Sequence, residues 1–218
     1  ACRNSEAYPS MEQWWDDLLA VYQIEIAELL AAGCTYLQFD EVPLAMLCDP
    51  EVQSQVLSMG LKPDQIITKY ITLINQLRAC CTSEVTVGMH MCRGNFRSRW
   101  LSRGGYEAVA ERIFTELDID VFFLEYDSGR AGDFTPLRFL SKNKTAVLGL
   151  VNTKTASLEV PKEIEHRLTE ASKILPLEQL ALSPQCGFAS VAGGNLLNET
   201  EQMAKLKLVV DIAANVWR

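Results

Sequence analysis

The chain has 218 residues, of which 48% are hydrophobic, and a formal net charge of −8 at pH 7. No run approaches the roughly 18 consecutive apolar residues of a membrane span, and the acidic balance opposes nucleic acid, whose phosphates require a positive surface. Seven cysteines, with no secretion-signal pattern at the N-terminus, predict a reducing, cytoplasmic location. We therefore expect small-molecule substrates, with no membrane and no nucleic-acid partner.

Hydrophobic periodicity divides the first half of the chain into alternating helices and strands. Residues 11–32 have the apolar spacing of an amphipathic helix, and Gly33 follows where a helix-ending glycine belongs. A short apolar run at 36–40 predicts the first strand. A helix over about residues 63–80 and a second strand over 85–91 complete this half.

The second half repeats the alternation. Helices are predicted at 105–117, 161–175 and 199–217, and strands at 120–125, 146–151 and 180–183. The strand at 120–125 is rich in the aromatic and β-branched residues that favour strands. Because no linker or composition break interrupts the pattern, we predict a single domain over residues 1–218.

The order of these elements predicts an α/β fold. Strands that alternate with helices form parallel βαβ units. Five such units fit either an open doubly wound sheet or part of a (β/α)8 TIM barrel. The barrel is favoured because the chemically capable residues lie at the C-terminal ends of the strands, which form the catalytic face of barrels.

Four candidate metal ligands lie at three of these strand ends. His90 and Cys92 are two residues apart, so that on a strand both side chains project to the same side. Glu125 ends the third strand, and Cys186 follows the last one. One nitrogen, two sulfurs and one carboxylate oxygen form a suitable tetrahedral zinc shell.

Each of these residues also has a simpler interpretation, which the sequence leaves open. A lone His-x-Cys pair is usually accidental, and Cys186 alone is typical of a core thiol. A buried Glu125 is usually paired with an arginine such as Arg130. We also predict that Asp127, Arg130 and Asp133 form a network that orients the loop after Glu125.

Four segments together resemble the cobalamin-independent methionine synthase family and occur in the family's order: LQFDE at 37–41, MHMC at 89–92, FLE at 123–125 and SPQCG at 183–187. The resemblance extends over residues 8–217 and is closest to the short, single-barrel members. It implies a catalytic zinc ion whose ligands are His90, Cys92, Glu125 and Cys186.

The resemblance also implies an activity, that of a 5-methyltetrahydropteroyltriglutamate–homocysteine S-methyltransferase. A methyl group from a methylated folate or another donor is transferred to the zinc-bound thiolate of homocysteine, giving methionine. Asp40 and Glu41 are the expected substrate-binding residues, and Asp40 holds the amino group of homocysteine. Asp40 and Glu125 are the expected catalytic residues, because a hard carboxylate oxygen holds zinc less firmly than a thiolate and is released more easily.

The chain departs from the family pattern in two ways. Residues 148–154 lack the histidine that longer family members carry there for the folate leaving group, so another acid, such as Lys154, or another donor, such as a methylated corrinoid, is needed. A barrel takes about 250 residues, and the resemblance places this chain at the last five βα units, the C-terminal portion. We expect a missing N-terminal segment or a second chain to complete the barrel, with Phe39, Val87 and Leu124 facing the missing strands.

Two rival functions come from other classes of protein. A zinc-stabilised barrel fragment without catalytic activity would use the same four ligands in a closed shell. An enzyme similar to uroporphyrinogen decarboxylase would share the barrel but need no zinc thiolates. Asp40, at the end of a further strand, favours a substrate site over both.

Overall fold

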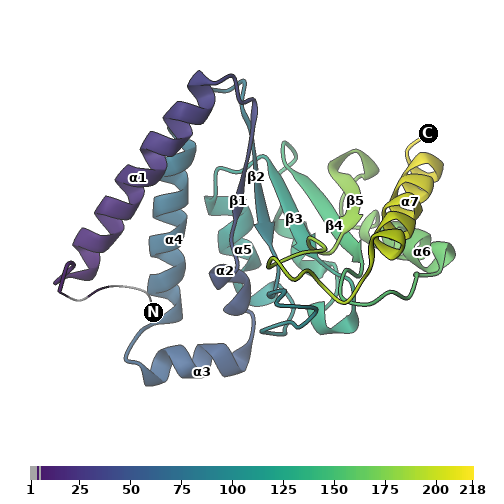
Figure 1. Ribbon diagram of the computed structural model, residues 1–218, viewed down its shortest axis with the longest axis horizontal. Coiled ribbons are helices and arrows are strands. Elements are labelled where there is room, and N and C mark those ends of the chain that lie inside the picture. Colours follow the sequence, from purple (N-terminus) through teal and green to yellow (C-terminus); the bar gives the residue numbers. More distant parts are fainter. Residues whose placement is uncertain (1–3, 5) are drawn as a thin grey trace.

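A computed structural model describes residue 4 and residues 6–218. Five strands of the described chain form one parallel sheet in the order β1-β2-β3-β4-β5 (Figure 1). The strands are β1 (Tyr36–Asp40), β2 (Thr86–Met91), β3 (Val121–Glu125), β4 (Thr145–Val151) and β5 (Leu180–Pro184). Each strand lies beside its successor in the sequence, as in a barrel, whereas a doubly wound sheet reverses its order at a switch point. The prediction of an α/β fold with five barrel-type units is confirmed.

Helices connect and flank these strands. In the described part of the chain they are α1 (Met11–Ala31), α2 (Pro43–Met46), α3 (Pro50–Ser58), α4 (Pro63–Arg78), α5 (Glu107–Glu116), α6 (Pro161–Ala171) and α7 (Glu199–Val216). Side chains satisfy free backbone N–H groups where two of the long helices begin. The Ser10 hydroxyl accepts from the first turn of α1, and Asn198 and Glu201 form a capping box at α7. Figure 1 shows α1 beside α4 at one end of the sheet and α7 at the other.

The short helices α2 and α3 were not predicted from the sequence. Helix α2 is a single turn, and α3 has no buried residue, so neither shows a clear apolar period. Both begin at a proline, and an acidic side chain one or two residues before that proline accepts a backbone N–H of the first turn. Glu41 accepts from the Leu44 N–H at 2.8 Å, and Asp49 accepts from the Glu51 N–H at 2.9 Å.

The two faces of the sheet have different environments. Side chains such as Met89, Phe122 and Leu148 are fully buried against the helices and form the core. Because side chains alternate along a strand, the neighbouring residues project from the other face, called here the open face. Along the open face His90 is paired in register with Asp40 on one side and Phe123 on the other, and none of these three is fully buried.

The expectation that Phe39, Val87 and Leu124 face missing strands is wrong. Val87 and Leu124 are fully buried in the cluster between the sheet and the helices, and Phe39 packs against that cluster. The physical reason is that the helices also require an apolar sheet face. With apolar residues on both faces, alternation shows which residues share a face but not which face the helices cover.

The sheet has two open edges within the described residues. Strand β1 pairs only with β2, and β5 pairs only with β4. Unpaired strand edges expose backbone N–H and C=O groups, which a closed barrel satisfies. As for membranes, none of the helices in the described ranges combines the length and the apolarity of a spanning segment.

Candidate functional site

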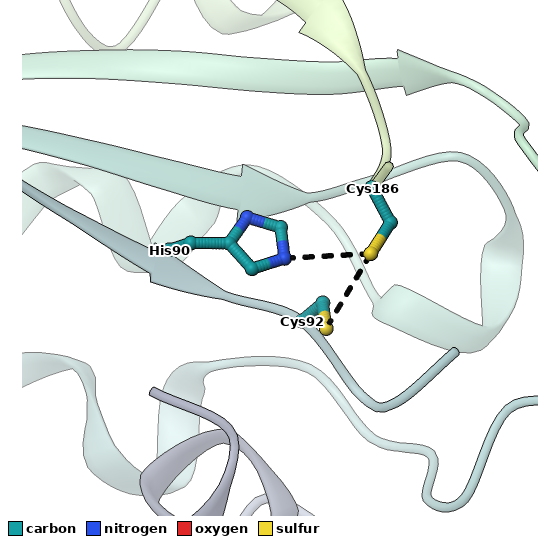
Figure 2. Close-up of side chains that lie close together, drawn as sticks. All are labelled: His90, Cys92 and Cys186. Atoms are coloured by element: carbon teal, nitrogen blue, oxygen red, sulfur yellow. Dashed lines mark hydrogen bonds between the residues drawn. The ribbon is translucent and has the colours of Figure 1, made fainter. Parts of the chain in front are cut away.

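Three side chains converge at the C-terminal end of the sheet. His90 lies near the end of β2, Cys92 follows that strand, and Cys186 follows β5. The Cys186 sulfur is 3.6 Å from His90 Nε2 and 4.0 Å from the Cys92 sulfur, the two contacts drawn as dashed lines in Figure 2. The three donor atoms lie within 4.8 Å of one another. Residues 94 positions apart in the sequence thus form one cluster, which strand-end convergence predicted.

The electrostatics of this cluster favour a cation. Contact between the two thiols lowers the pKa of Cys186, with a further contribution from His90, and the same contact together with burial raises the pKa of Cys92. Burial would lower the pKa of His90, but the contact with Cys186 and the negative charges of Asp40 and Glu125 together raise it. The cluster therefore favours a thiolate at Cys186. One imidazole and two sulfurs are donors that zinc prefers, so these residues fit a zinc ion.

Glu125 is fully buried next to this cluster but is held by other partners. Its carboxylate accepts from the Arg93 backbone N–H at 2.6 Å and forms an ion pair with Arg130. Burial would raise the pKa of Glu125, yet the Arg93 N–H and the positive charges of Arg130 and Lys154 lower it, so that the group is a carboxylate. The structure thus shows the arginine pairing, and the zinc-ligand role of Glu125 stays a prediction.

The network predicted around Arg130 is present in part. Besides Glu125, Arg130 lies 3.5 Å from the Asp127 carboxylate and donates to the Ser102 carbonyl at 3.0 Å. Asp133 instead accepts from the Thr135 N–H at 2.9 Å. The loop after β3 is therefore tied to the site through Arg130.

A cavity of about 540 Å³ opens beside the cluster on the open face. Its lining includes His90, Cys92 and Cys186, with Asp40 at the end of β1 and Phe123 from β3. Asp40 is exposed and is the register partner of His90, so its carboxylate lies at the same level of the sheet. The cavity thus has metal-type donors, a free carboxylate and an aromatic wall, and its volume is within the range of small-molecule sites.

The structure places Glu41 and Lys154 away from this lining. Glu41 is buried beneath α2, and burial raises its pKa to about 8. The hydrogen bonds that it accepts from backbone N–H groups of α2 lower the pKa, but by less than burial raises it. Its substrate-binding role stays a prediction. Lys154 is also buried, and its ammonium group donates to the Gln185 amide oxygen at 2.5 Å.

Two residues that contribute to this region were not identified from the sequence. The Tyr106 hydroxyl donates to the Met91 carbonyl at 2.5 Å and accepts from the Glu125 N–H at 2.9 Å, which joins the ends of β2 and β3. Asn95 lines the cavity and donates to the Gly187 carbonyl at 3.0 Å. No pattern in the sequence distinguishes either residue, because both act through contacts between distant loops.

Comparison with known proteins relates this chain to one family. Residues 7–215 match the family described as "Cobalamin-independent synthase, Catalytic domain". Two proteins of Bacillus subtilis (strain 168), both named as uncharacterized, are similar in sequence. YxjH is 43% identical over 212 residues, 97% of this chain and 56% of YxjH, and YxjG is 43% identical over 203 residues, 93% of this chain and 54% of YxjG. The chain thus spans about half the length of these curated relatives.

Two solved structures are similar in fold. A Listeria monocytogenes protein, provisionally named a vitamin-B12 independent methionine synthase, has a TM-score of 0.74 and 34% identity, covering 96% of this chain and 57% of its own. A B12-independent methionine synthase from Shewanella sp. W3-18-1, in complex with selenomethionine, has a TM-score of 0.70 and 20% identity, covering 96% of this chain and 56% of its own. At that identity the second structure supports the fold alone.

Proposed function

The chain belongs to the cobalamin-independent synthase family, in its catalytic domain, and from this premise we propose that it acts in zinc-dependent methyl transfer to the thiol of homocysteine, giving methionine. The observation that carries the proposal is the convergence of His90, Cys92 and Cys186 within 4.8 Å on the wall of a cavity. A purely structural zinc site has no need of an adjoining cavity with a free carboxylate. This chain spans about half the length of its relatives, so the activity is proposed for the whole protein.

The proposed zinc ligands are His90, Cys92 and Cys186, with Glu125 as the fourth. A zinc ion held by these residues would supply the Lewis acidity that favours the thiolate form of a coordinated thiol, the form that attacks a methyl group. The burial of Cys92 and of Glu125 excludes water from that side of the site. Arg130 keeps Glu125 ionised and holds its carboxylate next to the thiols while no substrate is present.

The proposed substrate contacts come from the cavity wall. Homocysteine carries an ammonium group, and Asp40 offers an exposed carboxylate on β1 in register with His90 on β2. Phe123, which pairs with His90 on the other side, provides an apolar surface for the methylene groups of the substrate. The methyl donor in this proposal is a methylated folate or another methyl donor, because residues 148–154 lack the histidine that serves the folate leaving group in longer family members.

Asp40→Asn should raise the KM for homocysteine by about 10- to 100-fold, because an ion pair with the substrate ammonium is replaced by a neutral contact, a difference of roughly 1.5–3 kcal/mol. Steady-state kinetics at varied homocysteine would measure it. Asp40→Glu keeps the charge and should recover part of the loss. If Asp40→Asn and the unmodified protein had the same KM for homocysteine, Asp40 would not be a substrate contact.

A direct test of the function is X-ray absorption at the zinc edge, measured before and after homocysteine is added. Catalytic zinc sites keep an exchangeable position, whereas structural sites are closed. We expect the sulfur contribution to the zinc ligand shell to increase and the oxygen contribution to decrease. An unchanged spectrum at saturating homocysteine would favour the zinc-stabilised fragment without activity.

A further inference from the structure

A tight hairpin at residues 96–99 follows β2 and Cys92. Phe96 and Arg99 exchange two backbone hydrogen bonds, at 2.8 and 3.0 Å, around a two-residue turn. The turn residues Arg97 and Ser98 have φ values of 50° and 67°, in the left-handed region that side chains disfavour. A strained turn of this kind persists only where surrounding contacts hold it, so those contacts are informative.

The contacts that hold the turn come from the loop between β5 and α7. The Ser98 N–H donates to Asn195 Oδ1 at 3.3 Å, and the Ser98 hydroxyl accepts from the Leu196 N–H at 2.8 Å. The Arg97 N–H also approaches the Ser190 hydroxyl, at 3.4 Å. The hairpin that follows Cys92 is therefore fastened to the loop that follows Cys186.

Asn195 links this pair of loops to a third one. Its side chain is buried, and its amide Nδ2 donates to the Thr153 carbonyl at 2.8 Å, in the loop after β4. The same Nδ2 lies 3.4 Å from the Gly187 carbonyl, which also accepts from Asn95 at 3.0 Å. Gly187 directly follows Cys186, so two amide side chains from different loops hold the carbonyl group one residue after that cysteine.

We propose that Asn195 is a positioning residue for the cysteine–histidine site: it holds the Cys186 segment against the Cys92 hairpin, and so sets the separation of the two sulfurs. Asn195 is not among the residues of the cavity wall and acts through Ser98, Thr153 and Gly187. The expected effect of Asn195 on metal binding rests on the zinc site of the proposed function. The expected effect of Asn195 on the exposure of the two thiols is independent of any metal.

The first measurement compares the zinc affinity of Asn195→Ala with that of the unmodified protein, by competition with a chelator. We expect a loss of about 10- to 100-fold, the range found when residues that orient metal ligands are removed. The visible spectrum of the cobalt-substituted protein should also change, since it reports the geometry of the ligands. The matched control is Asn198→Ala, three residues away at the end of the same loop, which removes the α7 cap and so lowers stability without removing a hydrogen bond between the loops.

The second measurement uses metal-free protein and labels its thiols with a maleimide, with Cys92 and Cys186 followed separately by peptide mass spectrometry. Cys92 is 3% exposed, and we expect it to react at least several-fold faster in Asn195→Ala, but at its normal rate in Asn198→Ala. If Asn195→Ala does not fold, Asn195→Asp replaces it, because this variant keeps the size and the acceptor for Ser98 while losing both donated hydrogen bonds.

The outcomes separate the two proposals. Unchanged labelling of Cys92 in the Asn195 variant, or a change of the same size in Asn198→Ala, would overturn the positioning role. An Asn195 variant with the zinc affinity of the unmodified protein would also overturn the positioning role. If the unmodified protein itself bound no zinc, the proposed function would fail, while faster labelling of Cys92 would still support the role of Asn195.

Discussion

Replacing Cys186 with serine will lower the zinc affinity of the protein by more than about 100-fold, beyond the loss usual for residues that merely orient a ligand. Cys186 is the central group of the cluster, in contact with both His90 and Cys92. Its lowered pKa makes it the thiolate of the three, and a serine hydroxyl neither ionises near neutral pH nor offers a soft donor. Metal analysis after dialysis, followed by chelator competition, would measure the loss. Methyl transfer should be lost with the metal.

Cys80→Ser is the matched control for this experiment. Cys80 lies just after α4, before β2 begins, and its thiol contacts the Gln76 carbonyl at 3.6 Å. It is therefore at the opposite end of β2 from His90, and the same chemical change there should leave zinc content intact. Full zinc occupancy in both Cys92→Ser and Cys186→Ser would show that these thiols are not the ligands.

Residues 1–218 expressed alone should transfer methyl groups about a thousandfold or more slowly than the complete barrel. A substrate that lacks part of its binding contacts is not held in the reactive orientation, and that orientation supplies much of the rate. Both sheet edges are unpaired within the described residues, and the cavity lies on the open face. The chain matches only about half of YxjH, YxjG and the two solved structures. Rates with homocysteine and a methylated folate, together with the oligomeric state by light scattering, would test this expectation.

Complementation gives this second prediction a positive control. Supplying the part of YxjH outside the match as a separate chain should restore activity, by covering the open face and pairing the strand edges. Zinc should still bind to residues 1–218 alone, since the three clustered donors are all present. An active monomer of residues 1–218 would contradict the prediction and show that this half contains the complete substrate site.

Much of the fold could be predicted because the pattern of apolar residues is local information. All five strands lie within one or two residues of their predicted bounds, and so do most of the ends of the long helices. The helix predicted at 161–175 ends earlier, at Ala171. The helices α2 and α3 were missed because short capped turns depend on contacts such as that of Asp49 with the Arg103 N–H, 54 residues away.

The order of the residues along the chain was enough to predict that His90, Cys92 and Cys186 converge, because side chains two apart on a strand share a side and parallel strands end at one edge of a sheet. The pairing of Glu125 with Arg130, the contact of Glu41 with α2 and the packing of Phe39 against the helices became clear only from the folded chain. The first two contacts join residues five and three positions apart, but their spacing does not show whether the chain turns back there, and the position of Phe39 depends on how the helices pack. Alternation along a strand assigns residues to a face, but the packing of the whole chain determines what covers that face.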